Sequence, residues 1–158
     1  MNFDIFDLGV IDYETAWKLQ DQYAAQIAEG TRLPTLLLLE HPHVYTFGRK
    51  GNAANLLWNE TQLKEKGIST YWVDRGGDVT YHGPGQLVGY PLIPLNPLRP
   101  ERSIVQSDYV GYIRKLEEML IRVLGRFGVT GMQRPGKSGF GFSRIRPPRS
   151  LPSASKWM

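Results

Sequence analysis

The fold of this chain is decided by the stretch Arg75-Gly76-Gly77-Asp78-Val79-Thr80-Tyr81-His82-Gly83-Pro84-Gly85-Gln86-Leu87-Val88-Gly89-Tyr90-Pro91, which we call the cradle. A turn that only joins two strands needs roughly two to five residues, and the cradle is longer and chemically richer. Glycine lets backbone N–H groups come close to a ligand, because it has no Cβ. We therefore interpret the cradle as a substrate site, and a purely structural turn with close backbone packing is the alternative.

In this interpretation the backbone N–H groups and Arg75 hold a polar head, while apolar walls hold the rest of the substrate. A histidine by itself is weak evidence, but His82 lies between Tyr81 and Gly83 in the same stretch. We expect His82 to donate a hydrogen bond to a carbonyl oxygen or to orient a neighbouring group.

Around the cradle, apolar residues alternate between strand-like and helix-like spacing. Helices are predicted at residues 12–29, 59–66 and 107–127, with Asp12 and Asn59 as N-caps and Gly30, Gly67 and Gly128 beyond their ends. Strands are predicted at residues 2–8, 35–39, 44–47, 68–73, 87–92 and 129–132, and the cradle follows the fourth of them and runs into the fifth. We predict an α/β domain whose mixed sheet is flanked by helices, because hairpin-like neighbours near the cradle argue against a purely parallel sheet. Residues 35–39 are expected to be covered on both faces.

Length and composition narrow the possible classes of protein. The chain has 158 residues, 41% of them hydrophobic, which suits one soluble globular domain. It contains no cysteine, which excludes disulfides, zinc–cysteine sites and a thiol nucleophile within the chain. No apolar run is long enough to span a membrane and no secretory signal is visible, so we expect a cytoplasmic protein.

The basic net charge of +4 comes from one segment. Residues 140–158 contain no acid and carry four cations, Arg144, Arg146, Arg149 and Lys156, so the remainder of the chain has a net charge of zero. We therefore expect no nucleic-acid partner.

Two further motifs leave alternatives open. The pair His41 and His43 has a spacing that could suit a metal, but only one other histidine exists and no metal site is expected. The run Gly48-Arg49-Lys50-Gly51 could hold a phosphate, although it lacks a Walker pattern and a solvated turn fits it equally well.

The cradle is also where the chain resembles a known family. Its segments Arg75-Gly76-Gly77, Thr80-Tyr81-His82-Gly83-Pro84-Gly85-Gln86 and Tyr90-Pro91 resemble the signature of lipoyl(octanoyl) transferases. Upstream, Glu40-His41-Pro42, Val44-Tyr45-Thr46 and Gly48-Arg49 resemble a second segment of that family, and Pro135-Gly136-Lys137-Ser138-Gly139 resembles the approach to a later strand. The resemblance covers about residues 1–139 and implies a biotin/lipoate ligase-like catalytic domain.

The resemblance implies an activity in lipoate biosynthesis. Members of the family move an octanoyl or lipoyl group from acyl carrier protein to a lysine on lipoyl domains of 2-oxoacid dehydrogenases and the glycine cleavage protein. They use no nucleotide or other cofactor, no metal and no membrane, whereas related ATP-dependent lipoate and biotin ligases carry different glycine–arginine loops. The resemblance assigns contact with the acyl group or thioester to eight residues, Arg75, Gly76, Gly77, Asp78, Val79, Thr80, Tyr81 and His82.

One departure from the family concerns its chemistry. In the family a cysteine thiolate attacks the thioester and a lysine lowers the pKa of that cysteine. Both family residues lie beyond the part of this chain that shows the resemblance, and the chain has no cysteine, so no residue of it is assigned either catalytic role. We expect residues 1–139 to form the N-terminal part of an octanoyltransferase-like catalytic domain, and residues 140–158 to be a non-homologous, disordered tail. The catalytic domain is then incomplete at its C-terminus.

The tail could belong to a natural family member with a divergent C-terminal segment, but codon arithmetic favours a frameshift near Gly139 or Phe140. When the third base of each codon is joined to the first two bases of the next, the junctions after Gly139 permit Val-Trp-Val, which resembles the family at that point. The junctions from Pro147 to Met158 permit Ala-Lys-Ile-Ala-Ser-Ile-Gly-Val-Lys-Val-Asp, which resembles the strand with the family's catalytic lysine. We therefore expect this chain to be inactive, and the alternatives are a non-catalytic remnant that binds acyl groups or lipoyl domains and an ATP-dependent ligase relative.

Overall fold

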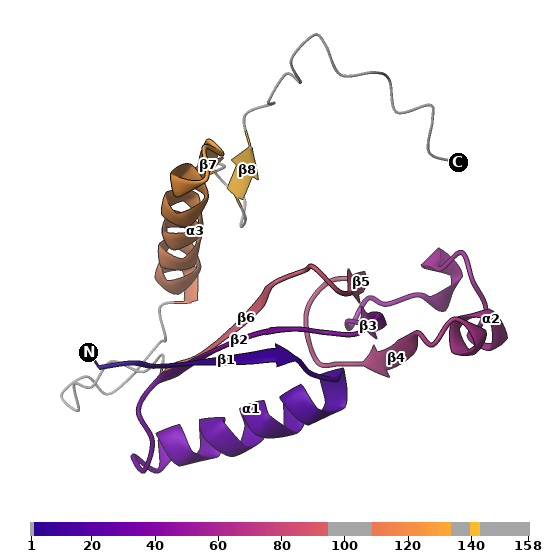
Figure 1. Ribbon diagram of the computed structural model, residues 1–158, viewed down its shortest axis with the longest axis horizontal. Coiled ribbons are helices and arrows are strands. Elements are labelled where there is room, and N and C mark those ends of the chain that lie inside the picture. The colour runs from indigo at the N-terminus through magenta and orange to yellow at the C-terminus, as the bar shows by residue number, and fades with distance from the viewer. Residues whose placement is uncertain (1, 95–108, 134–139, 143–158) are drawn as a thin grey trace, which may run out of the picture. The chain divides into compact units, whose positions relative to one another are not determined.

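The computed structural model describes residues 2–94, 109–133 and 140–142 (Figure 1). The chain divides into two compact units, residues 1–94 and 95–158, and each is described by itself. The sequence predictions for residues 134–139 and 143–158, with most of the expected tail, lie outside the described residues.

The first sheet of the N-terminal unit has the strand order β1-β2-β6. Strand β1 (Asp4–Val10) is parallel to β2 (Thr35–Glu40), and β6 (Val88–Leu92) is antiparallel to β2. Helix α1 (Tyr13–Ala28) lies along one face of this sheet (Figure 1). The buried core between helix and sheet contains Ala16, Leu37 and Leu39.

The predicted ends of α1 are confirmed. The carboxylate of Asp12 accepts a hydrogen bond from the backbone N–H of Thr15 at 2.9 Å, as an N-cap does. The helix ends at Ala28, two residues before Gly30. In β2 the residues alternate between buried and half-buried, so the strand is fully covered on one face and partly covered on the other.

The second sheet has the order β4-β3-β5. Strand β3 (Val44–Phe47) is parallel to β4 (Ser69–Trp72) and antiparallel to β5 (Val79–His82). Between β3 and β4 the chain forms a 3₁₀ turn (Ala53–Asn55) and helix α2 (Glu60–Glu65). The predicted cap of α2 is confirmed as a capping box, in which Asn59 and Gln62 exchange hydrogen bonds.

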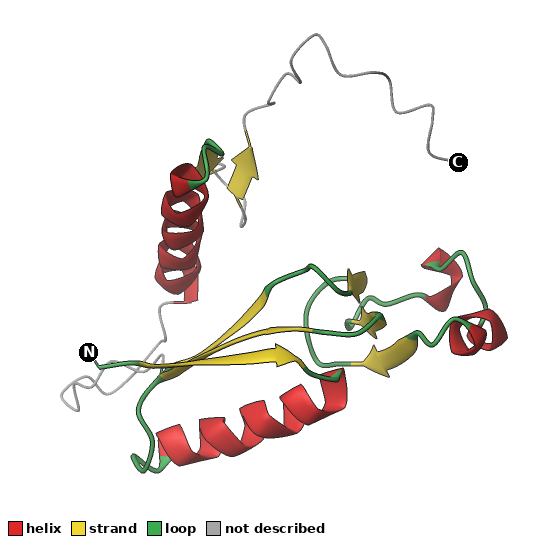
Figure 2. Ribbon diagram, viewed as in Figure 1, coloured by secondary structure: helices red, strands yellow, loops and turns green. Residues whose placement is uncertain are grey.

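The mixed α/β class is confirmed: the described strands of the N-terminal unit form two small mixed sheets, and those of the second unit form an antiparallel pair (Figure 2). The sequence prediction did not recognise β5, which runs through the middle of the cradle. Its four residues, Val79–His82, have β-forming side chains, but glycines on both sides made the whole stretch read as a loop. The cradle is therefore a loop, an edge strand and a tight turn that leads into β6.

The second unit contains helix α3 (Tyr109–Arg126) and the antiparallel pair β7 (Gly131–Gln133) and β8 (Phe140–Phe142). The amide of Gln133 donates to the main-chain oxygen of Arg114 at 3.1 Å and joins the strand pair to the helix. Strand β8 comprises the first three residues of the segment that we predict to be non-homologous, and that prediction stays open. None of the helices in the described parts of the chain is long and apolar enough to cross a bilayer.

Candidate functional site

The base of the site is formed by two glycine-containing loops packed backbone to backbone. The N–H groups of Gly48, Arg49 and Lys50 donate to the carbonyl oxygens of Asp78, Arg75 and Gly77, at 2.9, 2.9 and 3.1 Å. A Cβ on Gly48 would lie 2.5 Å from the oxygen of Gly77, so this packing requires glycine at position 48. Because these amides are already bonded, they are not free to cradle a phosphate, and the run 48–51 is a structural turn that supports the cradle.

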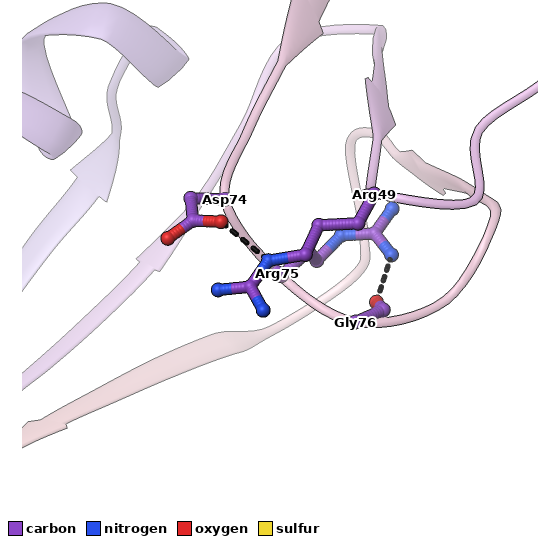
Figure 3. Close-up of polar contacts among 4 residues, drawn as sticks. All are labelled: Arg49, Asp74, Arg75 and Gly76. Atoms are coloured by element: carbon purple, nitrogen blue, oxygen red, sulfur yellow. Dashed lines mark hydrogen bonds and ion pairs between the residues drawn. The ribbon is translucent and has the colours of Figure 1, made fainter.

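Arg75 is the cation that this packing holds in place. Its Nη2 donates to the carbonyl oxygen of Thr46 at 2.6 Å and to Oγ1 of Thr46 at 3.0 Å. Its Nη1 donates to the oxygen of Gly76 at 3.0 Å, and Figure 3 shows this bond beside the Arg49–Asp74 pair. Arg49 in the neighbouring loop pairs with Asp74 at 2.5 Å, and both of these side chains are exposed. The guanidinium of Arg75 is therefore preorganised by the protein, and that of Arg49 is a surface charge.

Strand β5 divides the predicted substrate residues between the two faces of the second sheet. Directly paired residues on neighbouring strands point to the same face, and successive residues alternate. The register pairs Thr80 with Thr46 and His82 with Val44, so Thr80 and His82 share the face to which Arg75 is bonded, which we call the Thr46 face. Val79 and Tyr81 point to the opposite side, the Tyr81 face.

An aromatic cluster covers the Thr46 face and centres on Tyr13 at the start of α1. The Tyr13 ring lies 5.1 Å from the ring of Tyr71, 5.2 Å from His41 and 6.4 Å from His82, with which it is nearly parallel at 21°. Burial raises the pKa of Tyr13, and the positive charge of Arg75 opposes that rise. Tyr13, His82 and Arg75 therefore gather on one side of the sheet, although Tyr13 is distant in sequence from the other two.

His41 lies at the junction of the two sheets and is fully buried, with 0% of its surface exposed. Its Nδ1 lies 2.8 Å from the main-chain oxygen of Ile11, and a carbonyl only accepts, so Nδ1 carries the proton. Nε2 then accepts from the hydroxyl of Tyr90 at 3.0 Å. Burial lowers the pKa of His41 and the neighbouring His82 adds to the effect, while burial raises the pKa of Tyr90 to about 12.

The two histidines considered for a metal site therefore do not converge. Both ring nitrogens of His41 are engaged within the protein, whereas His43 bonds the hydroxyl of Tyr81 through Nδ1 at 2.6 Å on the Tyr81 face. Within the described residues, no group of three or more side chains is placed to hold a metal ion.

A tight turn after β5 orients His82. Its Nδ1 lies 2.8 Å from Oε1 of Gln86, and the turn is closed by a bond from the N–H of Gln86 to the oxygen of Gly83 at 3.1 Å. Glu40, at the end of β2, accepts from the N–H of Gly85 at 2.6 Å and anchors the turn. With Nδ1 donating to Gln86, the neutral ring offers Nε2 as an acceptor, and donation from Nε2 to a substrate carbonyl requires the imidazolium.

Asp78, which the resemblance placed among the substrate contacts, is turned toward the protein. Its carboxylate accepts hydrogen bonds from the backbone N–H of Asn52 at 3.1 Å and from the side-chain amide of Asn55. These bonds tie the 3₁₀ turn to the cradle, which gives Asp78 a structural role in this arrangement.

Two aromatic residues of the site, Tyr13 and Tyr71, were not singled out in the sequence, and Tyr90 was part of the signature but was given no role. Tyr13 follows a helix cap and reads as an ordinary helix residue, and its contacts arise only when α1 packs on the sheet. Tyr71 could have been found by strand alternation, because its register with Thr46 places both on one face.

The chain matches a known protein family over most of its length. The model of the lipoyl protein ligase A/B catalytic domain matches residues 12–143. An octanoyltransferase of Solibacter usitatus is 46% identical over 132 residues, which cover 84% of this chain and 57% of the relative. Octanoyltransferases of Geobacter metallireducens and Christiangramia forsetii are 48% and 40% identical and match 85% and 86% of the chain. The chain spans 57–60% of the length of these curated relatives.

Solved structures show the same fold at lower identity. A lipoate-protein ligase A bound with ATP is 21% identical with a TM-score of 0.57, and the match covers 87% of this chain and 51% of the ligase. A bi-partite lipoate protein ligase from Thermoplasma acidophilum, solved in a study that includes its E2 lipoyl domain, is 19% identical with a TM-score of 0.57, covering 85% of this chain and 49% of that one. The predicted ligase-like catalytic fold is thus confirmed, and the chain belongs to the lipoyl protein ligase A/B catalytic domain family.

Proposed function

We propose that this chain is part of an enzyme that transfers an octanoyl group from acyl carrier protein to a lysine of a lipoyl domain. The observation that carries the proposal is the identity of 40–48% to octanoyltransferases over about 85% of the chain. Lipoate–protein ligases of similar fold are only 19–21% identical, which favours transfer without ATP over ATP-dependent ligation.

The geometry supports the Thr46 face as the place where the acyl group binds. An octanoyl thioester has a long alkyl chain and one polar carbonyl. The rings of Tyr13 and Tyr71 offer apolar surface for the chain, while Arg75 and His82 supply polar groups beside it. A fixed guanidinium suits an oxygen that gains negative charge during acyl transfer, and His82 joins it as a donor in its imidazolium form.

Within the predicted set of eight contacts, we assign different roles to the two sides of β5. Arg75, Gly76, Gly77, Thr80 and His82 contact the acyl group or the thioester. Val79 and Tyr81 contribute through their backbone, because their side chains point to the other face. Asp78 holds the loop that bears them.

The partners and the compartment follow from the proposed reaction. Octanoyl-acyl carrier protein is the donor, and lipoyl domains of 2-oxoacid dehydrogenases and of the glycine cleavage protein are the acceptors. The reaction takes place in the cytoplasm, needs no added cofactor and involves neither nucleic acid nor membrane.

We further propose that residues 1–158 alone bind the octanoyl group without completing the transfer. A covalent acyl-enzyme needs a thiolate, and the chain contains no cysteine. The residues responsible for binding lie within 1–139, and residues 140–158 add nothing to the site. The second candidate function is that of a non-catalytic protein that binds acyl groups or lipoyl domains, because the contacts proposed on the Thr46 face are present while the nucleophile is lacking.

The experiment compares binding with transfer. Affinity for octanoyl-acyl carrier protein is measured by calorimetry. The unacylated carrier protein is the control for contacts that do not involve the acyl chain. Transfer is followed by the intact mass of a lipoyl domain, with and without ATP. We expect tighter binding of the acylated carrier and no modified lipoyl domain; equal binding of both carriers would contradict the acyl site, and ATP-dependent modification would indicate a ligase.

A further inference from the structure

A cavity of about 340 Å³ opens on the Tyr81 face of the second sheet, away from Thr80 and His82. Its walls are mostly aromatic and include one lysine. We call it the aromatic pocket, and its lining residues are His43, Tyr45, Trp58, Lys66, Ile68 and Tyr81.

Two parts of the sequence build the aromatic pocket. Its floor is the sheet, where Tyr45 of β3 and Tyr81 of β5 are direct partners with ring centroids 5.3 Å apart. Its rim comes from the residues on either side of α2, with Trp58 before the helix and Lys66 and Ile68 after it. The pocket thus lies entirely within the N-terminal unit.

The shape of the pocket depends on a glycine in the cradle. A Cβ on Gly83 would lie 2.2 Å from the hydroxyl of Tyr81 and 3.1 Å from Nδ1 of His43. Glycine at this position lets the Tyr81 ring lie close to the backbone and keep its 2.6 Å hydrogen bond to His43. Part of the cradle therefore serves the aromatic pocket and not the Thr46 face.

The charge of the pocket is positive. The ammonium group of Lys66 lies 4.8 Å from the centroid of the Trp58 ring, a cation–π arrangement that holds it at the rim. Neither Asp nor Glu lines the cavity, and among the described residues no carboxylate forms an ion pair with Lys66. An anionic group entering the pocket would therefore meet an uncompensated cation.

We propose that the aromatic pocket is a second binding site, for a small aromatic carboxylate. Its ring packs against Trp58, Tyr45 and Tyr81, and its carboxylate pairs with Lys66. The volume is at the lower end of the roughly 300–1,000 Å³ that is usual for small-molecule sites, which suits a ligand of one or two rings. An octanoyl thioester carries no charge and gains nothing from Lys66, so the ligand of this site differs from that of the Thr46 face. The proposal does not depend on the proposed function.

The test uses 2-naphthoate and its uncharged counterpart 2-naphthamide, each titrated into the chain of residues 1–158 by calorimetry. We expect naphthoate to bind about fivefold more tightly, as a partly exposed ion pair allows. Lys66→Gln should reduce naphthoate binding to the level of naphthamide. Lys64→Gln, at an exposed position of α2 outside the pocket, is the matched control and should leave the preference unchanged.

A second variant tests the aromatic walls. Trp58→Ala should weaken both probes by about fivefold to tenfold, since each loses one ring contact. Circular dichroism of both variants checks that they fold. Equal binding of the two probes, an unchanged preference in Lys66→Gln or no measurable binding to the unmodified chain would each overturn the proposal.

Discussion

The guanidinium of Arg75, at the start of the cradle, donates to the main-chain oxygen of Thr46 in strand β3 at 2.6 Å. The same group also reaches Oγ1 of Thr46 at 3.0 Å and the oxygen of Gly76. Three acceptors in the geometry of one planar fork position the charge more firmly than a lysine could. Arg75 therefore acts both as a brace of the fold and as the fixed cation of the Thr46 face.

Substitution by lysine should affect stability differently at Arg75 and at Arg49. Arg75→Lys keeps the charge but loses part of the hydrogen bonding, so we expect the free energy of unfolding to fall by about 1–3 kcal/mol. Arg49→Lys is the control and should change stability little, because the Arg49–Asp74 pair is solvent-exposed. Urea denaturation measures both variants, and equal losses in the two would contradict the special position of Arg75.

The packing of the two loops makes a sharper prediction about glycine. Gly48→Ala places a Cβ against three backbone oxygens, so we expect a loss of about 1–3 kcal/mol from overpacking together with weaker binding of octanoyl-acyl carrier protein. Gly76→Ala has open space around it and should stay within about 0.5 kcal/mol of the parent. If Gly76→Ala were the more harmful change, the loops would pack differently from this description.

His41 should make stability depend on pH. Its pKa in the folded chain is lowered from 6.5, mainly by burial, so the unfolded chain takes up a proton first as the pH falls. The contribution of His41 to the free energy of unfolding is therefore constant above about pH 6.5. Below that pH it decreases, by at most about 1.36 kcal/mol per pH unit. The rings that face His41 are those of Tyr13, His82 and Tyr90, and the Ile11 carbonyl and the Asp12 carboxylate partly oppose the lowering of its pKa.

Urea unfolding between pH 8 and pH 5 checks this dependence with two variants. His41→Gln should lower stability at pH 8 and remove the His41 contribution to the decrease at acid pH. His43→Gln, at an exposed histidine, should keep that contribution. A pH profile of His41→Gln that parallels the unmodified chain would show that another group is responsible.

Tyr13 provides a prediction about the acyl site that does not involve the signature residues. Its ring contacts Tyr71, His41 and His82, so Tyr13→Phe should keep the wall and leave affinity for octanoyl-acyl carrier protein within about twofold. Tyr13→Ala should weaken that affinity by about tenfold, which corresponds to the upper range for an aromatic contact. Calorimetry measures both, and unaltered binding by Tyr13→Ala would place the acyl chain elsewhere.

Much of the fold could be predicted because local rules agree with the tertiary structure. Asp12 and Asn59 begin α1 and α2 by side-chain capping, which depends on neighbouring residues alone. Strand β5 was missed because its pairing with β3 is a contact between distant segments, and the flanking glycines hide its alternation. The faces of the sheet could not be assigned without that register, so the sequence did not predict that the side chains of Tyr81 and His82 point to opposite sides.

The site is predictable in part for the same reason. Its signature names Arg75 and His82, but Tyr13 joins them only when α1 packs against the sheet. The role of Gly48 likewise depends on a second loop, 27 positions later, whose oxygens fill the space of a Cβ. Short motifs predicted the chemistry, and long-range packing determines which side chains surround the signature residues.

The proposed origin of residues 140–158 has its own test at the level of the gene. If the reading frame is lost near Gly139, resequencing should find a one-base difference there, followed by codons for Val-Trp-Val and for the lysine-containing strand. A verified, uninterrupted frame that ends at Met158 would contradict this explanation.

The most direct test of the central claim is the intact mass of a lipoyl domain after incubation with octanoyl-acyl carrier protein and no ATP. The assay compares residues 1–158 with the product of the same gene whose frame is shifted by one base after Gly139 and then translated to the stop codon of that frame, because residues 140–158 read in that frame supply a lysine but no cysteine. The account predicts an octanoylated lipoyl domain only with the frame-restored chain, and an unmodified one with the cysteine-free chain. Robust octanoylation by the cysteine-free chain, or by neither chain until ATP is added, would contradict it.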